Sequence, residues 1–213
     1  MQVLLISPKD PLVPKNLHNL LGGENTYTQM LLDFPPVNIR FDYFEDALVK
    51  RDITYHPLQN FFLYLQKLRI LPLGPRVQML VLRKKYDLVY AHAHPVKLFG
   101  LRAPLLISDS SSNRVFLDKY LKWPAWRIRL TTRLQSWLFV FFNIITGEIN
   151  SDKAEGFFVF SVWAQKIKNL EYRIKNCQVI YPGLPIPRVG QRHTRKRNSK
   201  QIKLLFVGVW FER

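Results

Sequence analysis

Residues Tyr86 to Pro95 read Tyr-Asp-Leu-Val-Tyr-Ala-His-Ala-His-Pro, and this stretch decides the fold that we expect. The run Leu88 to Ala91 is short and apolar, with a charge before it and a proline after it. Those limits predict a strand buried on both faces, which is typical of parallel sheets. Because ligands of open α/β sheets bind beyond the carboxyl ends of the strands, His92 and His94 are candidates for the floor of a site. The alternative is that His92 packs in the core and His94 is a solvated loop residue.

Strand patterns alternate with helical patterns on both sides of this stretch. The strands are predicted over residues 3–7, 37–44, 53–56, 88–91, 103–109, 157–160 and 178–181. The helices are predicted over residues 24–34, 60–71, 76–85, 124–142 and 162–170. This alternation predicts an α/β fold with a Rossmann-like, doubly wound parallel sheet. In that order the first strand neighbours strand 88–91, with the switch point between them. Residues 37–44 alternate strictly, which predicts a strand away from the sheet centre.

Composition limits the class of protein. The chain has 213 residues, of which 47% are hydrophobic and 14% aromatic, so it is not disordered. A single cysteine, Cys177, excludes an internal disulfide and fits a reducing, cytoplasmic compartment. We find no secretory signal, and the apolar run 137–145 is about half the ~20 residues that a spanning helix needs.

The net charge is +17, and residues 151–213 alone carry 13 Lys/Arg against 4 Asp/Glu. Such an excess indicates an anionic partner, which can be nucleic acid, an anionic membrane surface or a phosphorylated ligand.

The domain organisation changes near residue 185. Residues 1–184 form one predicted domain, and residues 185–200 are Pro-containing and basic without apolar periodicity, which predicts a solvated linker. An apolar strand pattern resumes at 202–207, so residues 201–213 are expected to begin a second Rossmann-like domain that is truncated here.

One glycine pair and two histidines are the candidate residues of a binding site. Gly22 and Gly23 lie in the loop that leaves the first strand, where glycines let the backbone approach a bulky anion. The alternative is a plain flexible turn. A metal at His92 and His94 would need a third ligand that the sequence does not name, so no metal is expected.

Several short motifs, taken in order, carry a family resemblance. They lie at residues 1–8, 22–23, 87–92, 159–163, 179–183 and 204–208. Together they resemble the N-terminal domain of a GT-B fold glycosyltransferase of family 4, the glycosyl transferases group 1 type. The resemblance implies transfer of a sugar from a nucleotide-sugar donor to a lipid-linked or saccharide acceptor, with retention and without a metal cofactor. The chain departs from the family pattern at Tyr90, Asp109 and Val209.

The same resemblance implies roles for particular residues. His92, His94 and Asp109 become the candidate catalytic residues, and Gly22, Gly23 and Gly208 become candidates for binding the donor phosphates. The donor would be held mainly by the second domain, so this chain alone is expected to be inactive in transfer.

A basic segment with tryptophans indicates membrane contact. Its residues are Lys119, Lys122, Trp123, Trp126, Arg127 and Arg129, followed by Arg133. This composition is typical of a helix at a lipid headgroup surface, and it predicts a peripheral position on the cytoplasmic membrane face. The alternative is a surface helix whose tryptophans pack inward. Two other function classes stay open, a basic nucleic-acid-binding module and a non-catalytic sugar- or lipid-binding module, although no nucleic-acid recognition motif is found.

Overall fold

The fold is that of a computed structural model, which describes residues 1–7, 28, 31–68, 70, 77–92, 94–109, 117–118, 122–172 and 177–180. Residues Met1–Pro182 form one compact unit. The predicted linker 185–200 and the predicted strand 202–207 lie outside the described residues, as do Gly22, Gly23, Gly208 and Lys119.

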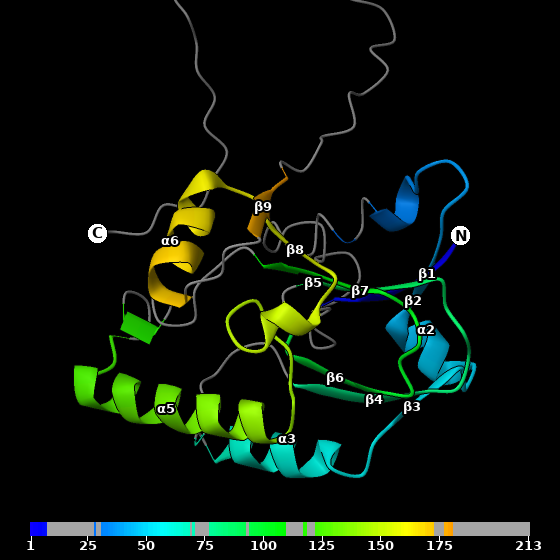
Figure 1. The fold of residues 1–213 in the computed structure, drawn as a ribbon. Helices are drawn as coiled ribbons and strands as arrows, with labels where there is room; N and C mark the ends of the chain where they lie inside the picture. The colour runs from blue at the N-terminus through cyan, green and yellow to red at the C-terminus, as the bar shows by residue number, and fades with distance from the viewer. Residues whose placement is uncertain are drawn as a thin grey trace, which may run out of the picture. The chain divides into compact units, whose positions relative to one another are not determined.

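The core of the unit is a six-stranded sheet in which every neighbouring pair of strands is parallel (Figure 1). In spatial order its strands are β2 (Arg40–Tyr43), β1 (Gln2–Ile6), β5 (Leu88–His92), β7 (Leu105–Asp109), β8 (Gly156–Val159) and β9 (Cys177–Val179). The chain therefore builds outward in one direction from β1 to β2 and in the other from β5 to β9. The predicted adjacency of the first strand and strand 88–91 is confirmed, with Leu4 opposite Val89.

Burial explains why β1 and β5 occupy the middle of this sheet. Leu4, Leu5 and Ile6 are fully buried, as are Val89 and Ala91. Strands covered on both faces need such continuous apolar runs. By contrast, β2 lies at the edge, as its alternating pattern predicted, and it is shorter than residues 37–44 because Phe44 begins a helix.

That helix, α2 (Phe44–Val49), was not predicted. Glu45 and Asp46 lie in its first turn, where negative charge interacts favourably with the helix dipole. Its buried residues Phe44 and Ala47 join the main apolar core against β1, β2 and β3.

A second, three-stranded sheet has the order β3 (Ile53–Tyr55), β4 (Gln78–Leu82), β6 (Val96–Phe99). β4 pairs antiparallel with β3 and parallel with β6. The predicted helix over residues 76–85 is therefore wrong. Residues 77–80 are all buried, and two strand partners satisfy the backbone of this short apolar run.

β6 was not predicted either, and it changes the connection between β5 and β7. After His94 and Pro95 the chain leaves the large sheet and enters the small one, where the Pro95 carbonyl accepts a hydrogen bond from the Gln78 amide at 2.8 Å. This crossover between two parallel neighbours therefore runs through a strand of the small sheet, whereas such connections usually run through a helix.

Two helices pack on the small sheet, α3 (Gln59–Lys67) and α5 (Ala125–Phe141). Phe62 of α3, Met79 of β4 and Phe139 of α5 are buried together in a second apolar cluster. Both helices were predicted. The spacing of Leu130, Leu134, Trp137 and Phe141 predicts one apolar stripe, but most of that stripe does not face the core in α5. Its Leu130, Trp137 and Phe141 are exposed, and the buried face carries other residues, namely Ile128, Thr131, Gln135, Leu138 and Phe139.

The last helix, α6 (Val162–Tyr172), contacts β8 and β9. Ser161 caps it, because the Ser161 hydroxyl accepts a hydrogen bond from the Ala164 amide at 3.1 Å. A short 3₁₀ turn, η3 (Ser151–Lys153), precedes β8.

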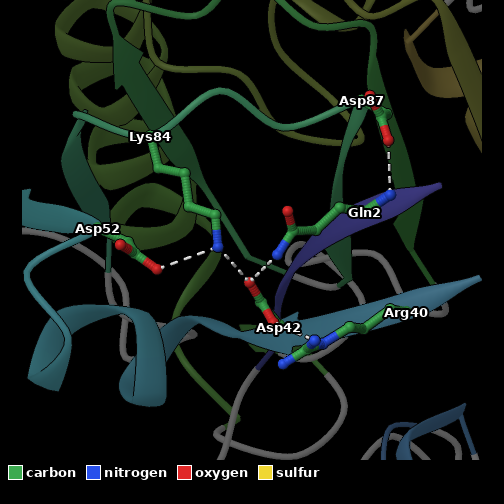
Figure 2. A network of polar contacts seen from close by, with 6 residues as sticks. All are labelled: Gln2, Arg40, Asp42, Asp52, Lys84 and Asp87. Atoms are coloured by element: carbon green, nitrogen blue, oxygen red, sulfur yellow. Dashed lines mark hydrogen bonds and ion pairs between the residues drawn. The ribbon is translucent and has the colours of Figure 1, made fainter.

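A polar network joins the two sheets at the amino end of β1 (Figure 2). The Lys84 ammonium lies 3.0 Å from Asp42 Oδ2 and 3.3 Å from Asp52 Oδ2. The Gln2 side-chain amide donates to Asp42 at 2.7 Å, and the Gln2 backbone N–H donates to Asp87 at 2.6 Å. Burial opposes ionisation of Asp42, but these hydrogen bonds outweigh it and hold the pKa of Asp42 below its usual value. We call this set the Lys84 network.

Candidate functional site

The carboxyl ends of β1, β5 and β7 bring polar residues to one edge of the large sheet. β1 is followed by Ser7, β5 ends at His92, and β7 ends at Asp109. His92 lies opposite Ser108 of β7 in the parallel register. This edge is where open α/β sheets bind ligands, and it lies at the opposite end of the strands from the Lys84 network.

His92 is held by a chain of hydrogen bonds. Its Nδ1 lies 2.7 Å from the Ser108 hydroxyl, which also lies 2.7 Å from the Tyr90 hydroxyl. The imidazole is fully buried, and burial lowers the pKa of His92 to about 4. His92 is therefore neutral near pH 7. A neutral imidazole in this place can exchange hydrogen bonds with a ligand, but it supplies no positive charge.

His94 is 6% exposed and lies where the chain passes from β5 to β6. The alternative that His94 is a solvated loop residue is thus wrong, whereas the alternative that His92 packs in the core agrees with its burial. The two histidines lie within one short segment, which connects the large sheet to the small one.

Asp109 belongs to a buried ion triad, which we call the Lys168 triad. The Lys168 ammonium lies 2.7 Å from Asp109 Oδ2 and 3.1 Å from Glu148 Oε1. Lys168 of α6 is 1% exposed. Burial works against its charge, but the two carboxylates outweigh burial and raise the pKa of Lys168. Asp109 is therefore a paired carboxylate, and an acceptor for hydrogen bonds rather than an isolated base.

The loop that delivers Glu148 is tightly fixed. The Thr146 hydroxyl accepts hydrogen bonds from the amides of Glu148 and Ile149, at 3.0 and 2.8 Å. Gly147 lies so close to Asp109 that a Cβ at this position would fall 2.5 Å from Asp109 Oδ2. Only glycine fits between the loop and the end of β7.

Lys168 and Glu148 were not predicted from the sequence. A signal for Lys168 existed, because it follows the buried Ala164 by four residues and so lies on the same inner face of α6. A lysine at a core position of a helix requires a buried partner.

Directly after β1, the hydroxyl of Ser7 contacts the hydroxyl of Thr28. The side chains of Ser7 and Thr28 are buried and hydrogen-bonded to each other. The Tyr43 hydroxyl donates to the Ser7 carbonyl at 3.2 Å, and burial raises the pKa of Tyr43 far above its usual value. These contacts hold Ser7 directly after the carboxyl end of β1.

The predicted membrane-contact residues that the structure describes lie just before α5 and in its first turns. Trp126 is 68% exposed, so the alternative in which both tryptophans pack inward is wrong for it. Trp123 is partly buried, and the Arg127 guanidinium lies over its ring at 3.9 Å. Lys122 and Arg129 are exposed.

Within the ranges that the structure describes, no group of three or more His, Cys, Asp or Glu is arranged to hold a metal ion. None of the helices in those ranges is long and apolar enough to cross a membrane.

Comparison with known proteins identified no relative. No family model, no curated protein and no solved structure matches the chain.

Proposed function

We propose that the chain is the acceptor-side, N-terminal part of a GT-B fold glycosyltransferase of family 4. Its reaction moves a sugar from a nucleotide-sugar to a lipid-linked or saccharide acceptor, with retention of configuration. One observation carries the proposal. The strand order reverses between β1 and β5, and His92 and His94 follow at the carboxyl end of β5. A Rossmann-like, doubly wound sheet would bind its ligand at that reversal.

The proposed roles follow from the local chemistry. His92 is neutral and buried, so it suits a hydrogen bond to a hydroxyl or phosphate oxygen that water no longer reaches. Asp109 is oriented by Lys168, and its carboxylate suits a hydroxyl of the acceptor. His94 would complete the catalytic set, and no metal is assigned.

The donor is assigned to a different part of the protein. Gly22, Gly23 and Gly208 would approach the donor phosphates, and the nucleotide would be gripped by a second domain introduced by residues 185–200. Enzymatic acceleration of roughly 10⁶-fold or more requires both reactants to be held together. The chain by itself would therefore bind an acceptor without transferring sugar. We place the parent enzyme on the cytoplasmic face of the membrane.

The proposal is tested by NMR titration of the intact chain with a short alkyl glucoside below its micelle concentration. We expect saturable shifts at His92, His94 and Asp109. His94→Gln should weaken binding about tenfold or more, the cost of about one lost buried hydrogen bond to the ligand. His56→Gln is the matched control, because His56 stacks on Phe99 of β6, in the other sheet. Absence of saturable shifts, or equal loss in both variants, would contradict the acceptor assignment.

Two further measurements on the same sample separate the other function classes. Incubation with UDP-glucose and GDP-mannose should release no free UDP or GDP. Turnover by the chain alone would contradict the two-domain assignment. Titration with single-stranded RNA at two salt concentrations should show no tight binding. Tight, steeply salt-dependent binding would instead support the nucleic-acid-binding module.

A further inference from the structure

Helix α5 is apolar on both of its faces. Its inner face buries Ile128, Leu138 and Phe139. On the opposite face, Trp126, Leu130, Trp137, Val140 and Phe141 are 57% to 68% exposed. A surface helix of a water-soluble domain normally has polar residues on its outer face. The outer face of α5 therefore indicates contact with something other than water.

The exposed apolar surface continues onto α3, which lies beside the end of α5 (Figure 1). Phe61 of α3 lies 6.2 Å from Phe142, Phe142 lies 5.0 Å from Phe141, and Phe141 stacks on Trp137 at 5.8 Å, all measured between ring centroids. Tyr64 of α3 is also exposed. We call this surface the α3–α5 face, defined by Phe61, Tyr64, Trp126, Leu130, Trp137 and Phe141. Contiguous apolar surface of this kind marks an interaction site.

The charges of the two helices have one sign. Residues 59–68 and 122–142 contain no Asp or Glu. Their charged residues are Lys67, Lys122, Arg127, Arg129 and Arg133. Arg129 and Arg133 are exposed on α5 among the apolar residues of its outer face. The partner is therefore apolar and carries negative charge at the same surface.

An anionic bilayer combines apolar surface with negative charge, whereas a second copy of the chain and nucleic acid do not match the face as well. Tryptophan, tyrosine and arginine are the residues that settle at the headgroup level, where an apolar body and a polar end are both satisfied. A second copy of the chain would set arginines against arginines across a two-fold axis. Nucleic acid would leave the exposed rings of α5 largely unmatched to its phosphates.

We propose that the α3–α5 face docks flat on an anionic membrane surface, with α5 parallel to the bilayer plane. The apolar side chains enter the boundary between headgroups and acyl chains, and Arg129 and Arg133 contact lipid phosphates. The contact surface is larger than the basic segment 119–133 that the sequence indicated, because it includes the end of α5 and part of α3. This docking is independent of sugar transfer, since none of the residues assigned to donor or acceptor takes part.

The test is flotation of the full chain with vesicles of mixed phosphatidylglycerol and phosphatidylcholine, and with phosphatidylcholine alone. We expect binding to the anionic vesicles and weak binding to the neutral ones. Trp137→Ala with Phe141→Ala should lower the partition coefficient about tenfold or more, because both residues supply buried apolar area. The matched control is Trp163→Ala with Leu170→Ala on α6, which removes equally exposed apolar side chains and should leave binding unchanged.

The ionic contribution is tested separately. Arg129→Gln with Arg133→Gln should lower binding to anionic vesicles, and the difference from wild type should shrink as salt rises from about 0.1 M to about 1 M. Arg83→Gln with Lys85→Gln is the control pair, because both residues are exposed outside the two helices. Circular dichroism melting verifies that every variant is folded.

Three results would overturn the proposal. One is absence of flotation with anionic vesicles, and another is equal loss of binding in the α5 and α6 variant pairs. The third is a dimer in sedimentation analysis that dissociates when Trp137 and Phe141 are replaced, which would identify a second copy as the occupant.

Discussion

The two ends of the large sheet each carry one lysine between two carboxylates, yet the two arrangements differ in burial. At the amino end Lys84 is 33% exposed, and at the carboxyl end Lys168 is 1% exposed. Water can therefore solvate Lys84 when a partner is lost, whereas Lys168 is closed off from water and depends on Asp109 and Glu148. The same set of charges has a partly solvated lysine at one end, and it is an interdependent unit around a buried lysine at the other.

Breaking the buried unit should produce the largest effect. Lys168→Met leaves Asp109 and Glu148 close together without their cation, and we expect it to lower the free energy of unfolding by about 3–5 kcal/mol. Urea denaturation followed by circular dichroism measures this change. Adding Asp109→Asn and Glu148→Gln to Lys168→Met should recover part of the loss, because the uncompensated charges are then removed. A loss below about 1 kcal/mol for Lys168→Met would mean that the triad is solvated like the Lys84 network.

Acidification should destabilise the two ends of the large sheet in different pH ranges. The folded pKa of His92 is about 4, below the ordinary histidine pKa of 6.5 that applies to the unfolded chain. A lowered histidine pKa gives stability that is complete above the unfolded pKa and is lost as pH falls. We therefore expect the free energy of unfolding to drop by about 3 kcal/mol between pH 6.5 and pH 4. His92→Gln should remove this step, and an unchanged step in that variant would exclude His92 as its source.

The Lys84 network should produce the smallest effects. Lys84→Met should cost about 1 kcal/mol in the same urea experiment, since Asp52 is then solvated in part and Gln2 still donates a hydrogen bond to Asp42. Asp42 has a lowered folded pKa, so its contribution is present above the unfolded pKa and is lost only as pH falls below about 4. Asp42→Asn should leave the decrease caused by His92 intact. It should reduce only the further loss of unfolding free energy below about pH 4. If Lys84→Met costs as much as Lys168→Met, burial does not distinguish the two ends.

Much of the large sheet could be predicted because its strands are continuous apolar runs. β1, β5 and β7 each combine a short apolar run with polar or proline limits, and their order followed from the alternation of patterns. The small sheet could not be predicted in the same way. β4 has four apolar residues in a row after Gln78, and periodicity alone does not separate such a run from a buried helix.

The candidate site was predictable only in part, for a different reason. His92 and His94 were found because they directly follow a recognisable strand. The Lys168 triad joins residues that are 59 and 20 positions apart, so a pattern within one segment cannot show it. The exposed face of α5 was also hidden, because both faces of this helix are apolar and the sequence alone does not tell which one is buried.

The Lys168 triad also bears on the order in which the molecule assembles. Asp109 comes from β7, Glu148 from the loop after α5, and Lys168 from α6, and Gly147 closes against Asp109. An ammonium cannot be desolvated before its carboxylates are in place, so α6 and the loop 146–150 should close over the sheet in one late, cooperative step. Hydrogen exchange should then give the amides of α6 and of this loop one shared opening free energy. Two distinct values would show that α6 opens and closes without waiting for the loop.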